Sequence, residues 1–308
     1  QFHYSFFNFL CGNLFMKWSR LFSKRFEVIQ DVAYAQPGVK PLKYDVFLPE
    51  GAKGLPAIII IHGGGWSANT EDIMRGLARE LVRSGEYVVC SIDYRWIGKL
   101  DGDEEANEMR DLIEDVYGAI AHIQEHADRY EINPAQLAVT GDSAGGHLSA
   151  SAINMAGMIG ERGFGELEGV YEYLPTYVPK GKSVSQLRDE ITTSLLAAAP
   201  SYGVFGGQRL SSHGEGKPEG WLEALSPIDT IPAIADRAVP QLLLRGTKDW
   251  IKDEDVQAYA DALAAAGQRV EYVQIPEARH AFFDWKPNAE TIATFKKFGV
   301  PSAATMKL

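Results

Sequence analysis

Short apolar runs alternate with longer amphipathic segments from about residue 42 to residue 298 of this chain. Most of the apolar runs carry hydrophobic side chains at consecutive positions, which is typical of parallel strands buried on both faces. The amphipathic segments have helical spacing, so the alternation predicts a mostly parallel central sheet flanked by helices on both faces. The predicted strands are Leu42–Leu48, Ala57–Ile61, Tyr87–Ile92, Leu137–Thr140, Leu195–Ala199, Gln241–Arg245 and Val270–Ile275. The predicted helices are Thr70–Ser84, Glu104–Ala127, Ala144–Ala156, Asp253–Ala266 and Ala289–Phe298.

The composition limits the partners that this chain can have. Its 308 residues are 45% hydrophobic and 23% charged, which suits one large globular domain with an apolar core. A net charge of −11, without a basic stripe among the aromatic residues, argues against nucleic acid. The longest apolar run in the body of the chain, Ala57–Ile61, is far shorter than the roughly 20 residues of a membrane span. Cys11 and Cys90 predict neither a disulfide nor a metal site, and they leave the cellular compartment open.

The first 41 residues differ in composition from the rest and predict an N-terminal extension, an arm or a cap, ahead of a domain over residues 42–308. Residues 1–26 contain four basic residues and no acidic one. Aromatic side chains recur there at helical spacing, namely Phe15, Trp18, Phe22 and Phe26. This pattern predicts a helix that packs on its own domain or on a partner in a homodimer, with a membrane-surface anchor as the alternative.

Two irregular stretches interrupt the alternation of strands and helices. They lie near residues 157–190, which are rich in Gly, Pro and Tyr, and near residues 203–222. Long irregular insertions in a compact domain are usually lids or binding loops. We therefore expect lid-like insertions after the helix over Ala144–Ala156.

A glycine-rich hexapeptide, Gly141-Asp142-Ser143-Ala144-Gly145-Gly146, lies between a predicted strand and a predicted helix. A serine flanked by glycines in this context is typical of a nucleophile elbow, a strained turn that exposes the serine hydroxyl at the top of a sheet. The glycines leave room for the neighbouring strand and helix to approach. Ser143 is therefore the candidate nucleophile.

A serine hydroxyl is a weak nucleophile and needs a general base beside it. In sites of this kind the acid and the histidine follow the serine along the chain. His147 lies one helical turn after Ser143 and points along the helix, so it is poorly placed to reach the hydroxyl. His280 follows the last predicted strand, at the same sheet edge as the elbow, and is preferred as the base over His213 in the irregular insertion.

The acid that orients the histidine is expected in a loop after a strand between Ser143 and His280. Asp249 follows a buried strand and a glycine turn, which places its carboxylate at the required sheet edge. Asp253 suits the first turn of the next helix better, and Asp229 is more remote. Asp249 is therefore preferred over both.

A second glycine-rich motif, His62-Gly63-Gly64-Gly65-Trp66, directly follows the strand Ala57–Ile61. Attack on a carbonyl places negative charge on its oxygen, and fixed backbone N–H groups can stabilise that charge. The triple glycine alone could also cradle a phosphate, but its pairing with the elbow points to an oxyanion hole. The predicted donors are the N–H groups of Gly64, Gly65 and Ala144.

Together with Asp93-Tyr94-Arg95, these motifs resemble the α/β-hydrolase superfamily over about residues 40–298. Within it, the chain is similar to hormone-sensitive-lipase-like esterases and to bacterial carbohydrate esterases that cleave feruloyl or acetyl esters. Arg95 is followed by Trp96-Ile97-Gly98-Lys99, which departs from the lipase-like branch and favours the carbohydrate-esterase side. The resemblance implies a serine carboxylesterase without metal or organic cofactor.

The expected substrate is a short-chain or carbohydrate-linked carboxylic ester, cleaved through an acyl-enzyme. Aromatic residues in the surrounding loops could bind a feruloyl ring or a sugar, or could simply pack a lid. The pocket candidates are Trp66, Tyr94, Trp221 and Phe282, with Tyr171, Tyr173, Tyr177 and Phe283 nearby. A serine peptidase or amidase, a formamidase, and a hydrolase-fold binding protein without turnover remain as alternatives.

Overall fold

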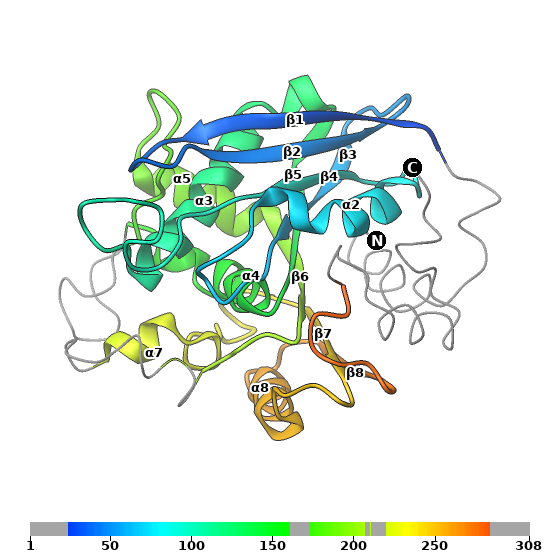
Figure 1. Ribbon diagram of the computed structural model, residues 1–308, viewed down its shortest axis with the longest axis vertical. Coiled ribbons are helices and arrows are strands. Elements are labelled where there is room, and N and C mark those ends of the chain that lie inside the picture. Colours follow the sequence, from blue (N-terminus) through cyan, green and yellow to red (C-terminus); the bar gives the residue numbers. More distant parts are fainter. Residues whose placement is uncertain (1–23, 161–172, 207–209, 211–219, 284–308) are drawn as a thin grey trace.

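The computed structural model describes residues 24–160, 173–206, 210 and 220–283, and these build around one eight-stranded sheet (Figure 1). The strand order is β1-β2-β4-β3-β5-β6-β7-β8. Strand β2 is antiparallel to both of its neighbours, β1 and β4. All the other neighbouring strands in this order, from β4 and β3 to β7 and β8, pair in parallel. The predicted mostly parallel sheet is therefore confirmed. The strands are β1 Phe26–Ala35, β2 Leu42–Pro49, β3 Leu55–Ile61, β4 Val88–Ile92, β5 Ile132–Asp142, β6 Leu195–Ser201, β7 Gln241–Gly246 and β8 Val270–Ile275.

The central strands are apolar at consecutive positions because both of their faces are covered. Residues 57–61 of β3 are fully buried between β4 and β5, and every residue of β4 is buried. β-Branched side chains such as those of Ile58–Ile61 suit this environment because they fill a pleated surface with little rotamer freedom to lose. Figure 1 shows the strands turning from nearly level at β1 and β2 to steep at β6, as the right-handed twist of strands requires.

Helices pack along the sheet. Helix α2 contacts β2 and β4, α4 crosses β3, β5 and β6, and α8 covers β7 and β8. The helices are α2 Arg75–Val82, α3 Met109–Glu125, α4 Ala144–Asn154, α5 Val184–Ser194, α7 Trp221–Leu225 and α8 Asp253–Ala265, and short 3₁₀ helices span Glu71–Met74, Ala127–Tyr130, Ala156–Met158 and Pro227–Asp229. None of the helices in the described part of the chain has the length and apolar character that a membrane crossing requires.

The largest difference from the sequence-based prediction is strand β1. The sequence pattern predicts that these residues belong to the N-terminal extension. In the structure they pair with β2 from Phe26↔Pro49 to Ala35↔Leu42, so β1 is an outermost strand of the sheet. Phe26, assigned above to a helical aromatic face, is the first residue of this strand. Residues 1–23, with the rest of that face, lie outside the described residues.

Two helix boundaries also differ from the prediction, each for a local reason. Helix α3 begins at Met109 rather than Glu104 because Glu108 and Asp111 form a capping box at its start. The segment predicted as one helix over Thr70–Ser84 divides into a 3₁₀ turn and α2. The predicted helix Ala289–Phe298 lies outside the described residues.

The first irregular insertion, near residues 157–190, includes most of helix α5 and a segment over residues 173–178. This segment is held against α3. The backbone N–H of Leu174 donates to Glu114 Oε1 (2.9 Å), and that of Thr176 donates to the Glu114 carbonyl (3.2 Å). Beside these two bonds, Arg95 donates to the buried Asp115 carboxylate through Nε (2.8 Å) and Nη2 (2.9 Å). Burial raises the pKa of Glu114 to about 7, against the smaller opposing effects of the Leu174 N–H and Arg110.

We predict that Glu114→Gln stabilises the protein above pH 7. The Glu114 carboxyl stays protonated in the folded state up to about pH 7, whereas an unfolded chain releases this proton near pH 4.5. The wild-type free energy of unfolding therefore falls as the pH rises from about 4.5 to about 7, and a glutamine, which keeps the acceptor for Leu174, removes this loss. Urea unfolding from pH 4 to pH 8 measures it, with the exposed Glu105→Gln as control. Parallel curves for Glu114→Gln and wild type would contradict the assignment.

Candidate active site

Ser143 occupies a tight turn between the end of β5 at Asp142 and the start of α4 at Ala144. Its backbone has φ 52° and ψ −113°, a conformation that is strained for any residue with a Cβ. The turn is possible because its neighbours are small. A Cβ on Gly145 would lie 2.0 Å from the carbonyl oxygen of Ile61. Helix α4 therefore starts in direct contact with the end of β3.

Ser143, His280 and Asp249 form a continuous chain of hydrogen bonds. The Ser143 Oγ lies 2.8 Å from His280 Nε2, and His280 Nδ1 lies 2.9 Å from Asp249 Oδ1. An ionised carboxylate can only accept, so Nδ1 carries the proton and Nε2 is free to accept from the hydroxyl. The Asp249 side chain is fully buried, whereas 18% of the His280 side chain is exposed. The structure thus brings together the three residues that sequence reasoning selected for nucleophile, base and acid.

The loop that carries Asp249 is held by its own backbone and by a buried arginine. Asp249 Oδ1 also accepts from the N–H of Ile251 (2.8 Å). The Arg245 guanidinium, at the end of β7, donates to the carbonyls of Ile251 (2.7 Å) and Asp249 (3.3 Å). Sequence reasoning missed Arg245. The signal was present, because a charged residue inside the apolar run Gln241–Arg245 needs buried partners.

Aromatic rings surround His280. The Tyr202 ring lies 4.9 Å from the imidazole and the Trp250 ring 4.6 Å, measured between centroids. Phe282 packs on Tyr202 at 4.7 Å and is almost fully buried. The histidine therefore contacts two aromatic side chains, which restricts its movement.

The glycine-rich motif after β3 is fastened to the nucleophile turn. The N–H of Gly63 donates to Asp142 Oδ1 (2.7 Å), one residue before Ser143. Gly64 and Gly65 have φ values of 127° and 60°, and a Cβ on Gly64 would lie 2.3 Å from the Ala68 carbonyl oxygen. Glycine is required at Gly64 both by this φ and by the lack of space.

His62 supports the same loop from within the core. It is fully buried, with Nδ1 2.7 Å from the Gly63 carbonyl oxygen and Nε2 3.2 Å from Asp93 Oδ1. Both partners are acceptors, so both bonds form together only when both ring nitrogens carry a proton. Lys40 lies 2.9 Å from Asp93, and Tyr94 stacks on the imidazole at 4.3 Å.

The structure separates the aromatic pocket candidates. Tyr94 is fully buried and donates its hydroxyl to the His62 carbonyl (2.9 Å), so it lies behind the glycine loop and lines no open space. Trp66 is partly exposed and donates to His147 Nδ1 (3.3 Å). Trp221 begins α7 and is 8% exposed.

The alternative triad members lie elsewhere or outside the described residues. His147 is fully buried, and its Nε2 donates to the Leu225 carbonyl (2.8 Å). Asp253 accepts from the Tyr272 hydroxyl (2.6 Å) at the start of α8. Asp229 ends a short 3₁₀ helix. His213 and Tyr171 lie outside the described residues.

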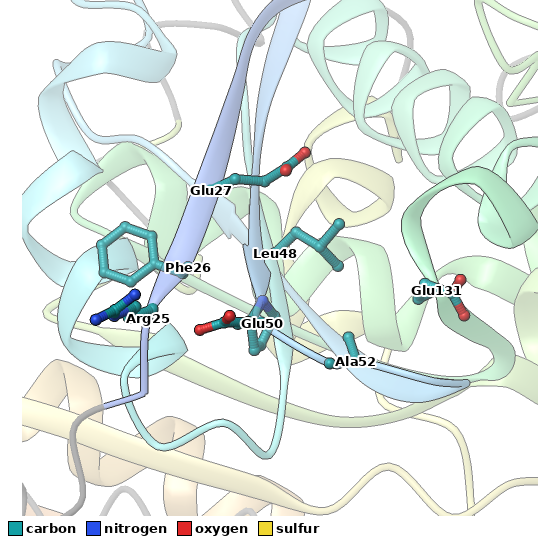
Figure 2. A pocket seen from close by; sticks show the side chains of 9 residues that line it. Arg25, Phe26, Glu27, Leu48, Glu50, Ala52 and Glu131 are labelled. Atoms are coloured by element: carbon teal, nitrogen blue, oxygen red, sulfur yellow. The ribbon is translucent and has the colours of Figure 1, made fainter.

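Figure 2 shows a depression of about 450 Å³ that is lined by residues near the end of β2. Because the end of β2 lies beside the start of β4, the depression is at the amino ends of the parallel strands, whereas Ser143 follows the carboxyl end of β5. The depression is bounded by the start of β1 and the end of β2, with Glu131 from the turn before β5. Arg25, Glu27 and Glu50 add charged side chains, and no nucleophile and base meet there. Within the described part of the chain, no cluster of three or more His, Cys, Asp or Glu residues could hold a metal ion.

Comparison with known proteins places the chain in a family. The model of a family described as alpha/beta hydrolase fold matches residues 58–284, which include Ser143, Asp249 and His280. The chain therefore belongs to the alpha/beta hydrolase fold family, in agreement with the sheet order and the nucleophile turn described above. This confirms the predicted fold class.

Curated relatives are named as ester hydrolases. The chain is 29% identical to the carboxylic ester hydrolase LipN of Mycobacterium tuberculosis over 77% of its length, and it spans 60% of that protein. It is 25% identical to the carboxylesterase NlhH of the same organism over 83% of its length, spanning 76% of that protein. Among solved structures, native Est2, a thermophilic esterase from Thermogutta terrifontis, superposes with a TM-score of 0.64 at 22% identity, covering 90% of this chain and 89% of the other.

We predict that Gly145→Ala destabilises the protein by about 2–3 kcal/mol. The added Cβ would lie 2.0 Å from the Ile61 carbonyl oxygen and 2.6 Å from that of His62, and both are backbone atoms that cannot turn aside. Gly157→Ala is the matched control, because nothing lies within 4 Å of its Cβ. Urea midpoints measure both variants. Equal midpoints for the two would show that α4 can move away from β3 without cost.

Proposed function

We propose that this protein is a carboxylic ester hydrolase in which Ser143, His280 and Asp249 form the catalytic triad. The observation that carries the proposal is the hydrogen-bond chain from the Ser143 hydroxyl through His280 to the buried Asp249 carboxylate. The strained turn at Ser143 and its position between β5 and α4 support it. The names of the relatives LipN and NlhH support the same reaction class.

The proposed reaction has two halves. Ser143 Oγ attacks the ester carbonyl carbon while His280 Nε2 takes its proton, and the resulting imidazolium is stabilised by Asp249. The carbon–oxygen bond to the alcohol then breaks, and His280 returns the proton to the departing alcohol oxygen, which leaves an acyl-enzyme. Water attacks the acyl-enzyme with His280 again as base, and Ser143 recovers its proton as the carboxylic acid is released.

The proposed oxyanion donors are the N–H groups of Gly64, Gly65 and Ala144. Ala144 is the first residue of α4, where backbone N–H groups lack helical partners and favour negative charge. The glycine loop is held beside Ser143 by the Gly63–Asp142 hydrogen bond (2.7 Å), so its amides need little reorganisation as charge develops. A single donor of this kind typically lowers the activation barrier by about 3 kcal/mol.

The proposed substrates are short-chain or carbohydrate-linked esters, the latter carrying acetyl or feruloyl groups. Aromatic residues follow two of the strands that end near Ser143: Trp66 lies in the loop after β3, and Phe282 and Phe283 lie in the loop after β8, where both contact Tyr202. Phe283 donates its N–H to the Tyr202 hydroxyl (3.2 Å), which joins these loops to the ring beside His280. Rings of this kind suit an acyl or sugar group of modest size.

We predict that Ser143→Ala lowers kcat by about 10⁴-fold or more and leaves the fold intact. The variant removes one oxygen and keeps the Cβ, so the backbone strain of the turn is unchanged. Hydrolysis of p-nitrophenyl acetate, butyrate and dodecanoate, of methyl ferulate and of acetylated xylan measures the loss. Thermal unfolding should give a midpoint within a few degrees of wild type.

The control for this prediction is Ser185→Ala, an exposed serine at the start of α5. It should keep wild-type rates on every ester of the panel. Wild-type turnover in Ser143→Ala would overturn the triad assignment. Absence of ester turnover in the wild type, with Ser143 still labelled by a fluorophosphonate, would redirect the assignment from esters to amides.

A further inference from the structure

Trp250 is a large aromatic residue that the fold exposes beside the triad. It directly follows Asp249, its ring centroid lies 4.6 Å from that of His280, and 57% of it is exposed. An exposed indole leaves a large apolar surface in contact with water, and burying that surface would be favourable. An exposed aromatic ring next to reacting groups is therefore a candidate for contact with a ligand.

The backbone on both sides of Trp250 is anchored in the core. Asp249 is 9% exposed and Ile251 is fully buried. The Arg245 guanidinium donates to the carbonyls of both neighbours, at 3.3 Å for Asp249 and 2.7 Å for Ile251, and the Ile251 N–H donates to Asp249 Oδ1 (2.8 Å). The backbone of the loop is thus held at the residue before Trp250 and at the residue after it. Binding of a ligand to the Trp250 ring would therefore cost little backbone conformational entropy.

The chemistry of the triad decides which part of an ester would meet this ring. His280 Nε2 must reach the departing alcohol oxygen in order to protonate it, so the alcohol leaves on the His280 side of the carbonyl carbon. The oxyanion faces the opposite wall, where the Gly63–Asp142 bond fixes the glycine loop. A side chain that contacts the His280 ring is therefore placed to meet the alcohol.

We propose that Trp250 is a specificity-determining residue that binds the alcohol half of the ester and selects alcohols that carry a ring with an apolar face. The ring can be aromatic or the apolar face of a sugar, because both pack against an indole face. This inference rests on the proposed triad and adds to it the identity of the leaving-group site. Arg245 is the positioning residue that holds the Trp250 loop.

The experiment varies the alcohol while the acyl group stays constant. Ethyl acetate, benzyl acetate and 6-O-acetylglucose all form the same acetyl-enzyme, so its hydrolysis is common to the three. Any difference in kcat/KM therefore arises in binding and acylation, the steps in which the alcohol is still present. In Trp250→Ala we expect kcat/KM to fall about tenfold for one or both ring-bearing esters and less than about twofold for ethyl acetate. Trp250→Phe keeps an aromatic face and should retain most of the preference.

A second readout separates binding of the alcohol from support of His280. During turnover of ethyl acetate, added benzyl alcohol or glucose competes with water for the acetyl-enzyme, and the ratio of ester to acetate formed reports on the alcohol site. Trp250→Ala should lower this ratio by about the same factor as kcat/KM, since the same contacts act in both directions. Ile234→Ala, which removes an apolar side chain of 48% exposure before β7, should change neither measurement.

The outcomes distinguish this inference from the proposed triad. A loss confined to benzyl acetate assigns an aromatic alcohol, and a loss confined to 6-O-acetylglucose assigns a sugar. An equal fall for all three esters would overturn the inference, because Trp250 would then act by holding His280. A change that follows acyl length in ethyl butyrate and hexanoate would also overturn it. Only retained turnover in Ser143→Ala would overturn the triad itself.

Discussion

The close contact between the ends of β3 and β5 is the constraint on which the site depends. The strands pair in parallel register up to Ile61↔Gly141, and each continues into a tight loop at the same edge. The Gly63 N–H donates to Asp142 Oδ1 across this gap, which fastens the glycine loop to the nucleophile turn. Gly145 lets α4 begin against the Ile61 carbonyl. Without these small residues, the serine and the glycine loop could not lie together.

Buried polar and charged side chains hold the loops at the carboxyl ends of the strands. The imidazole of His62 lies 2.7 Å from the Gly63 carbonyl oxygen and 3.2 Å from Asp93, which also pairs with Lys40 from the turn between β1 and β2. At β7, the Arg245 guanidinium satisfies the carbonyls on both sides of Trp250. A buried group of this kind destabilises the folded state unless it is paired, and displacing either loop would leave such a group without its partners. Buried side chains with hydrogen-bond partners therefore support both the glycine loop after β3 and the loop of Asp249.

The parallel sheet also explains why the three hydrogen-bonded residues meet at one end of the strands. Ser143, Asp249 and His280 follow β5, β7 and β8, and the carboxyl ends of parallel strands meet at one edge. The charged depression at the other end lies where β2 ends and β5 begins, far along the strands from Ser143. Although the depression is large, its lining residues do not bring a nucleophile and a base together, so it has no means of cleaving an ester.

Features set by neighbouring residues could be predicted from the sequence, namely the alternation of strands and helices and the turn at Ser143. They follow from side-chain periodicity and from the space that small residues leave around the turn, and both act over a few residues. Asp249 and His280 were predicted by another route, from the order in which the acid and the histidine follow the serine in sites that contain such a turn. Strand β1, the packing of Tyr94 behind the glycine loop, and the pairing of Arg245 with the loop of Trp250 were decided only by the tertiary structure. Each depends on partners brought together by folding, and a pattern of local propensities carries no information about which distant group will satisfy a buried charge or a free strand edge.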